Sequence, residues 1–310
     1  MAMMNISQLR PKNLNEFQGK NELKESLKIY IKSALSRKEN LDHCLFYGPP
    51  GIGKTSLANI IAQELGVNIK IIQGPDIQNK SDLISIIYTI NDFEIIFIDE
   101  IHSMNPICYE LLYSIMENFK LNITIGKEFN SKSTLINVPR FTLIGATTKL
   151  GNLPNPFEER FGIVIPITEY SESEILLILK YNCSVLKIKM ELEILKKIAS
   201  YSKGIPRIAK RILSRVLDYK IITNEEILDI FKKIGLHPWG LNKTDIDYLK
   251  LLISNKKTGL KTISQVLYLD ERTIQEKIEP YLIKKNLIVK TNGGRVITED
   301  GIKYLNELIL

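Results

Sequence analysis

One loop constrains the fold more than any other stretch of this chain. Residues 48–55 read GPPGIGKT and fit the pattern G-x-x-x-x-G-K-[ST] without a mismatch. The apolar run at 44–47 predicts a buried strand before the loop, and helical apolar spacing over 56–65 predicts a helix after it. Loop N–H groups and a helix N-terminus together bind anions. The stretch therefore predicts an α/β fold that holds the phosphates of a nucleoside triphosphate.

The residues of this loop have separate predicted roles. Lys54 is expected to reach the β- and γ-phosphates, and the Thr55 hydroxyl is expected to ligate Mg²⁺. Glycines let the backbone close around phosphate oxygens, and here they are Gly48, Gly51 and Gly53.

Two further buried runs end in polar residues. Residues 93–98 are apolar except for Glu94 and precede Asp99 and Glu100, as in a parallel strand buried on both faces. Such strand ends meet the ligand in open α/β sheets, so Asp99 is expected to hold Mg²⁺ and Glu100 to orient or deprotonate a water. The alternative is a strand that ends in solvated acids. The run at 141–146 ends at Thr147 and Thr148, where a hydroxyl can sense the γ-phosphate.

Alternating apolar and polar residues predict a β-hairpin over about 121–138, inserted before the strand at 141–146. Its isoleucines, Ile123, Ile125 and Ile136, either form a contact surface for a partner or pack on their own domain. The spacing does not separate these two interpretations.

The pattern is purely helical from residue 166 to about 234, which predicts a small all-α domain. After a break at 235–240, three helical patterns and two strands around Asn292-Gly293-Gly294 predict a winged helix. Lys290 and Arg295 flank this turn and suit phosphate contacts.

The third helical pattern of the winged helix carries Glu271, Glu276 and Glu279, which is atypical of a base-reading helix. Winged helices also serve as protein-contact modules, so DNA binding and protein binding both remain open from this domain alone.

Bulk properties add little. The net charge of +7 favours an anionic partner, although the abundance of Lys, Ile and Asn can also reflect an AT-rich genome. Three separate cysteines, Cys44, Cys108 and Cys183, indicate reduced packing residues and hence a cytoplasmic location. No apolar run has the length of a membrane span, so no membrane partner is expected.

Taken together, these residues resemble the RuvB family of Holliday-junction branch-migration motors, which are AAA+ ATPases. The resemblance extends from Leu9 nearly to the C-terminus. Its most specific motifs are LDH at 41–43, FIDEIH at 97–102, IGK at 125–127, FTLIGATT at 141–148, RFG at 160–162 and EPYL at 279–282. It implies a P-loop AAA+ core with an inserted β-hairpin over 1–165, an all-α lid domain over 166–236 and a winged-helix domain over 237–310.

The resemblance also assigns roles to single residues. Glu100 and Asp99 are the implied catalytic and metal-linked acids, Thr148 is the implied sensor, and Arg160 is the implied arginine finger for ATP on a neighbouring subunit. From its neighbours alone, Arg160 more often indicates a surface ion pair. The other implied nucleotide contacts are Leu9, Arg10, Ser56, Glu117, Asn118, Phe119, Tyr170 and Arg207.

The implied activity is ATP- and Mg²⁺-dependent branch migration by a hexameric ring on four-way junction and duplex DNA. The inserted hairpin is then the implied RuvA-binding element. The wing departs from the usual family sequence, because Lys290 and Gly293 stand where arginines are common, which predicts weaker DNA binding. The alternatives are another AAA+ DNA remodeller, such as a clamp-loader subunit or replication initiator, and a nucleotide-gated scaffold that does not hydrolyse ATP.

Overall fold

The computed structural model describes residues 9–125, 132–219, 226–255 and 257–309, without the side chains of 122–125, 132–133 and 309. The chain divides into two compact units, Met1–Ser214 and Arg215–Leu310. This division falls inside helix α8 (Pro206–Leu217), so the boundaries inferred from the sequence at residues 165 and 236 stay predictions. Among the described residues, no helix is both long and apolar enough to cross a bilayer.

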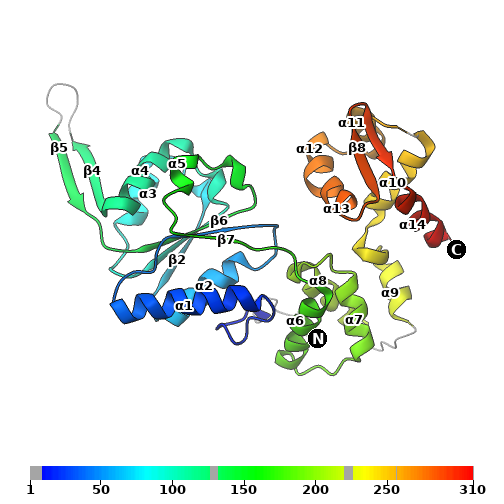
Figure 1. The fold of residues 1–310 in the computed structure, drawn as a ribbon, viewed down its shortest axis with the longest axis horizontal. Coiled ribbons are helices and arrows are strands. Elements are labelled where there is room, and N and C mark those ends of the chain that lie inside the picture. Colours follow the sequence, from blue (N-terminus) through cyan, green and yellow to red (C-terminus); the bar gives the residue numbers. More distant parts are fainter. Residues whose placement is uncertain (1–8, 126–131, 220–225, 256, 310) are drawn as a thin grey trace. The chain divides into compact units, whose positions relative to one another are not determined.

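A parallel sheet lies at the centre of the first unit (Figure 1). Its described strands are β1 (Cys44–Tyr47), β2 (Ile69–Gln73), β3 (Ile95–Asp99), β6 (Thr142–Thr147) and β7 (Ile163–Pro166). They run in the order β2-β3-β6-β1-β7, so β6 separates β1 from β3. The loop after β1, the acids at the end of β3 and the threonines at the end of β6 therefore meet at one sheet edge. Edge strand β7 was not predicted, because its apolar residues are few and follow a turn-rich segment.

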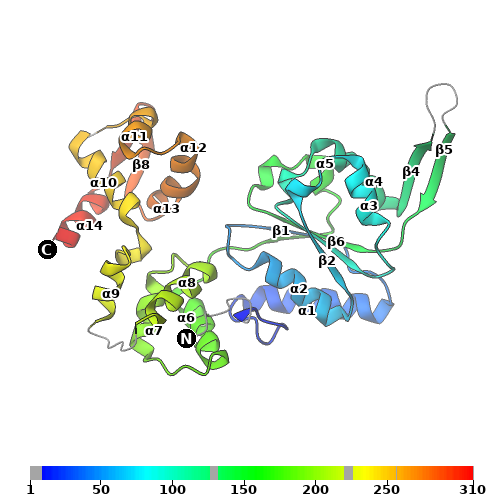
Figure 2. The same cartoon turned by 180° about the vertical axis from the view of Figure 1, so that it is seen from behind.

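Helices cover both faces of this sheet (Figures 1 and 2). On one side lie α1 (Asn21–Arg37) and α2 (Lys54–Leu65), and on the other lie α3 (Lys80–Ile87) and α4 (Pro106–Asn118). Because side chains alternate along a strand, Ile96 and Ile98 of β3 join the cluster that packs against α3 and α4. Shorter elements complete this part of the fold: η2 (Gly74–Asp76), η3 (Ile101–Ser103), η5 (Leu150–Asn152) and α5 (Asn155–Glu158).

An antiparallel hairpin extends from this unit (Figures 1 and 2). Strands β4 (Lys120–Ile125) and β5 (Lys132–Asn137) pair from Lys120 with Asn137 to Ile125 with Lys132. The side chains of Ile123 and Ile125 lie outside the described residues, whereas Ile136 is half-buried. The predicted partner surface on these isoleucines therefore stays a prediction.

Three helices follow the sheet. Helices α6 (Glu172–Val185) and α7 (Leu192–Ser200) belong to the first unit, and α8 begins in it. Helix α6 begins where Ser171 and Glu174 form a capping box, in which each side chain satisfies the other's backbone N–H. Helix α8 begins at Pro206, two residues after Gly204, which adopts a left-handed conformation.

The second unit contains a winged helix with its own apolar core, built on Tyr248, Leu249, Leu282 and Ile288. Its described elements are α9 (Ile227–Lys233), η6 (Pro238–Gly240), α10 (Lys243–Asn255), α11 (Leu260–Leu267), α12 (Glu271–Thr273), η7 (Ile274–Ile278), α13 (Glu279–Lys284), β8 (Ile288–Thr291), β9 (Gly294–Ile297) and α14 (Glu299–Ile309).

Three features of the winged helix differ from the sequence prediction. The expected bend near Pro280 is a π-helical turn, η7, because proline has no N–H and its ring crowds the preceding helical turn. The two strands, expected at 287–290 and 295–298, each lie one residue nearer the turn, since Thr291 pairs with Gly294 across a two-residue turn. The C-terminal helix α14 was not predicted.

Candidate active site

Glycines shape the loop between β1 and α2. Gly48 has φ +149°, and a Cβ on it would stand 2.1 Å from the carbonyl oxygen of Ile167, so a side chain there is excluded. Gly53 caps α2 with φ +116°, which places Lys54 at the first turn of the helix. The loop is tied to the sheet by a hydrogen bond from Gly48 N to Thr147 O at 3.2 Å.

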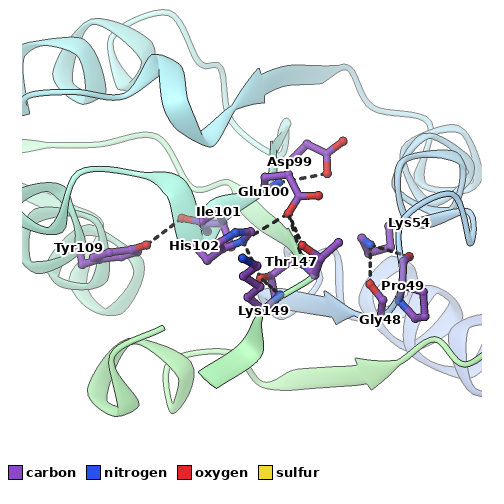
Figure 3. A network of polar contacts seen from close by, with 11 residues as sticks. Gly48, Pro49, Lys54, Asp99, Glu100, Ile101, His102, Tyr109, Thr147 and Lys149 are labelled. Atoms are coloured by element: carbon purple, nitrogen blue, oxygen red, sulfur yellow. Dashed lines mark hydrogen bonds and ion pairs between the residues drawn. The ribbon is translucent and has the colours of Figure 1, made fainter. Parts of the chain in front are cut away.

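The predicted phosphate-binding lysine is buried inside this loop. Lys54 is 6% exposed, and its Nζ donates to Gly48 O at 2.8 Å and Pro49 O at 3.1 Å (Figure 3). Burial lowers the pKa of Lys54, and the carboxylates of Glu100 and Asp99 oppose that shift. A buried cation beside open space is suited to an anionic ligand.

Thr55 and Asp99, the predicted metal ligands, lie side by side. Thr55 Oγ1 donates to Asp99 Oδ2 at 3.2 Å, and Glu100 N donates to Asp99 Oδ1 at 3.1 Å. Thr55 and Asp99 would offer oxygen atoms as metal ligands, which Mg²⁺ prefers. Within the described ranges, no cluster of three His, Cys, Asp or Glu side chains could hold a metal. The pair therefore fits Mg²⁺ bound mainly through phosphate and water, which is its usual mode.

Glu100 is held by a polar network at the ends of β3 and β6. Its Oε2 accepts from Thr148 Oγ1 at 2.9 Å and lies 3.3 Å from His102 Nδ1. His102 Nδ1 also lies 2.9 Å from Thr147 Oγ1 (Figure 3). Burial lowers the pKa of His102, and the nearby Glu100 carboxylate opposes that shift. The catalytic carboxylate predicted from the sequence thus touches the predicted sensor, Thr148, directly.

Two adjoining pockets occupy this sheet edge. We call one the phosphate pocket; its lining includes Arg10, Gly51, Lys54, Thr55, Asp99, Glu100 and Arg207. We call the other the base pocket; its lining includes Leu9, Phe17, Ile52, Tyr170, Ile178, Tyr181 and Asn182. Both pockets share Gly53, Ser56, Pro206 and Lys210. A base and a phosphate chain can therefore occupy one continuous site.

The helices after the sheet close this site through backbone and side-chain contacts. Arg207 N donates to Gly51 O at 3.3 Å, and Lys210 Nζ donates to Leu9 O at 2.7 Å. Burial, together with the nearby Arg10, lowers the pKa of Lys210 to about 8. Burial also raises the pKa of Tyr170 above its usual range. Sequence reasoning missed Lys210 and Asn182, because both occupy ordinary positions in helices and belong to no motif.

Four predicted contacts lie outside both pockets. Arg160 Nη1 bonds Glu117 Oε1 at 2.9 Å, and its guanidinium lies 5.8 Å from the centre of the Tyr113 ring. Asn118 ends α4, and Phe119 follows it as the C-cap. These residues gather on one surface of the first unit rather than at its own phosphate loop.

The two predicted DNA contacts are engaged within the winged helix. Arg295 Nε donates to Glu279 Oε1 at 2.7 Å, and Lys290 Nζ lies 2.7 Å from Glu279 Oε2. Glu279 is fully buried and also accepts from Tyr248 Oη at 3.0 Å. Arg295 is 14% exposed and Lys290 46%, so Lys290 is the more available to a phosphate. The sequence counted Glu279 only among the acids of a helix atypical of base reading, and did not reveal that it is buried and paired with both basic residues of the wing.

A phosphate loop after β1, acids at the end of β3 and a helical lid define a P-loop nucleotide-binding protein of the AAA+ class. Comparison with known families agrees. Residues 9–167 match the Holliday junction DNA helicase RuvB P-loop domain, 170–235 the RuvB AAA lid domain, and 238–306 the RuvB C-terminal winged helix domain. The chain belongs to the RuvB family, and the predicted fold class is confirmed.

Individual relatives cover nearly the whole chain. It is 45% identical over 311 residues to the Holliday junction branch migration complex subunit RuvB of Ureaplasma urealyticum serovar 10, covering 99% of this chain and 100% of that one. It is 41% identical to the protein of the same name from Clostridium kluyveri, covering 96% and 88%. The solved Thermotoga maritima RuvB Holliday junction branch migration motor superposes with a TM-score of 0.83 at 35% identity, covering 96% and 98%.

Proposed function

We propose that this protein is an ATP-hydrolysing ring motor that drives branch migration of Holliday junctions together with a RuvA partner. The relatives at 45% and 41% identity are named as subunits of a branch migration complex. The observation that carries the proposal is the contact of Glu100 with Thr148 beside the Thr55–Asp99 pair, at the mouth of a phosphate loop. This arrangement is equipped for hydrolysis as well as for binding.

Each residue has a task in that reaction. Lys54 and the loop N–H groups bind the phosphates, while Thr55 and Asp99 hold Mg²⁺. When bound, Mg²⁺ would neutralise negative charge on the phosphates. Glu100 orients the attacking water and accepts its proton, and Thr148 fixes the Glu100 carboxylate through the 2.9 Å hydrogen bond.

The site is completed by a neighbouring subunit. Arg160 and Glu117 form an exposed pair that does not line the pockets of their own chain. A head-to-tail ring brings such a surface against the next subunit's phosphate pocket. In this proposal Arg160 stabilises transition-state charge there, and Glu117, Asn118 and Phe119 contact the same nucleotide. The resemblance favours six subunits.

In this proposal the winged helix binds DNA, and Lys290 is more exposed than Arg295 for a phosphate contact. The hairpin β4–β5 is the proposed RuvA surface. The winged-helix match at 238–306 argues against a clamp-loader subunit, and the Glu100–Thr148 contact argues against a scaffold that does not hydrolyse ATP.

The proposal is tested by steady-state ATP turnover, with and without a synthetic four-way junction and RuvA. We expect turnover that the junction stimulates. The matched control is Glu100→Gln, which keeps the side-chain shape and should bind ATP while losing hydrolysis. Turnover of the wild type that equals that of Glu100→Gln supports the scaffold instead. A turnover rate that is the same with and without junction DNA argues against a DNA motor.

A further inference from the structure

Asn182 is a buried amide without a partner. It lies on α6 and is 0% exposed. Neither Nδ2 nor Oδ1 has a hydrogen-bond partner among the residues that the structure describes. A buried amide that lacks partners destabilises the folded state, so the position needs an explanation.

Asn182 is one of the residues that line the base pocket. Apolar side chains, among them Ile52 and Ile178, form much of the lining, and the pocket has a cavity volume of about 50 Å³. This pocket adjoins the phosphate pocket through Gly53 and Ser56. A group that occupies it would therefore be attached to the phosphates held by the loop.

Several other polar side chains of this lining already have hydrogen-bond partners. Tyr181 Oη donates to Glu16 Oε2 at 2.8 Å, and Gln18 Nε2 donates to Asn15 O at 3.2 Å. Lys210 Nζ bonds Leu9 O. Asn182, in contrast, has both a donor and an acceptor to offer.

We propose that Asn182 recognises the adenine base of the bound nucleotide. Adenine carries its 6-amino donor beside a ring-nitrogen acceptor, and a carboxamide pairs with such an edge through two hydrogen bonds. Oδ1 accepts from the 6-amino group, and Nδ2 donates to the neighbouring ring nitrogen. Asn182 is thus a specificity-determining residue, and the inference rests on the nucleotide binding proposed above.

The test compares ADP with purine riboside diphosphate, which lacks only the 6-amino group. Affinities are measured at equilibrium by calorimetry on the full chain, so neither hydrolysis nor DNA enters the readout. The variants are Asn182→Ala and Asn182→Leu. The matched control is Asn40→Ala, because the Asn40 amide is also without a partner among the described residues but lines a different pocket.

We expect the wild type to bind ADP about tenfold more tightly than the analogue, since the analogue forms one hydrogen bond fewer and leaves the acceptor Oδ1 unpaired. Both Asn182 variants should lose that preference by weakening ADP binding, and Asn40→Ala should keep it. Asn182→Leu should also raise the unfolding temperature without nucleotide, because it removes an unpaired buried amide; a structural role for Asn182 predicts a lower one.

Equal weakening of ADP and the analogue, or no change in either, overturns the inference while leaving nucleotide binding intact. If the wild type binds neither compound, the proposed function fails and this inference fails with it.

Discussion

Replacing Arg160 with alanine separates the shared-site account from a merely structural one. The Arg160–Glu117 pair is exposed, with side-chain exposures of 39% and 46%. An exposed pair contributes at most about 1 kcal/mol to stability. An arginine finger is worth roughly 10³–10⁵ in rate, or about 4–7 kcal/mol of transition-state stabilisation. We therefore expect Arg160→Ala to fold and bind ATP like the wild type while losing nearly all turnover.

The assay measures turnover number, ATP affinity and unfolding temperature for Arg160→Ala, Lys54→Ala and an equal mixture of the two. Neither variant alone should turn over ATP. In mixed rings about a quarter of the interfaces join an intact phosphate loop to an intact arginine, so turnover should partly return. Absence of any recovery on mixing, or full turnover by Arg160→Ala alone, would refute the shared site.

Three further changes probe other contacts. Thr148→Val removes the donor to Glu100 and should lower turnover by about 10- to 100-fold with little effect on ATP affinity; equal loss of affinity would contradict this. Gly51→Ala should weaken ATP binding by about tenfold, measured by calorimetry, because φ +80° and a Cβ contact at 2.8 Å strain the loop. Glu279→Gln should destabilise the winged helix by about 2–3 kcal/mol in urea unfolding, since it leaves Arg295 without its carboxylate. Burial alone would raise the pKa of Glu279, but hydrogen bonds from its partners hold the pKa below its ordinary value. The stabilisation from ionised Glu279 is therefore complete above the ordinary glutamate pKa and is lost as pH falls through the lowered pKa of the folded protein. A wild type whose unfolding free energy does not fall in acid would contradict the assignment.

The phosphate loop could be predicted from sequence because its chemistry is local. Gly48, Gly53 and Lys54 act through backbone conformation and spacing within eight residues, so the pattern contains most of the geometry. The placement of Asp99 and Thr148 beside the loop needed one more rule, that parallel strands end at a common edge. Strand order β3-β6-β1 satisfies that rule directly.

The contacts that sequence reasoning missed join residues far apart in the chain. Lys210 reaches Leu9 across 201 residues, and nothing near either residue signals the contact. In the sequence Glu279 is indistinguishable from the other acids of its helix. Only the fold brings Tyr248 and Arg295 to its carboxylate. The role of the isoleucines in hairpin β4–β5 also could not be read from alternation, because alternation fixes a face but not what covers it.

The most direct test of the central claim follows strand exchange itself. A four-way junction labelled with a donor and an acceptor dye reports branch migration as a change in energy transfer, with RuvA present throughout. We predict movement with wild-type protein and ATP, and none with Glu100→Gln or with ADP. Movement at the same rate without ATP hydrolysis, or junction-stimulated hydrolysis without movement, would contradict the account.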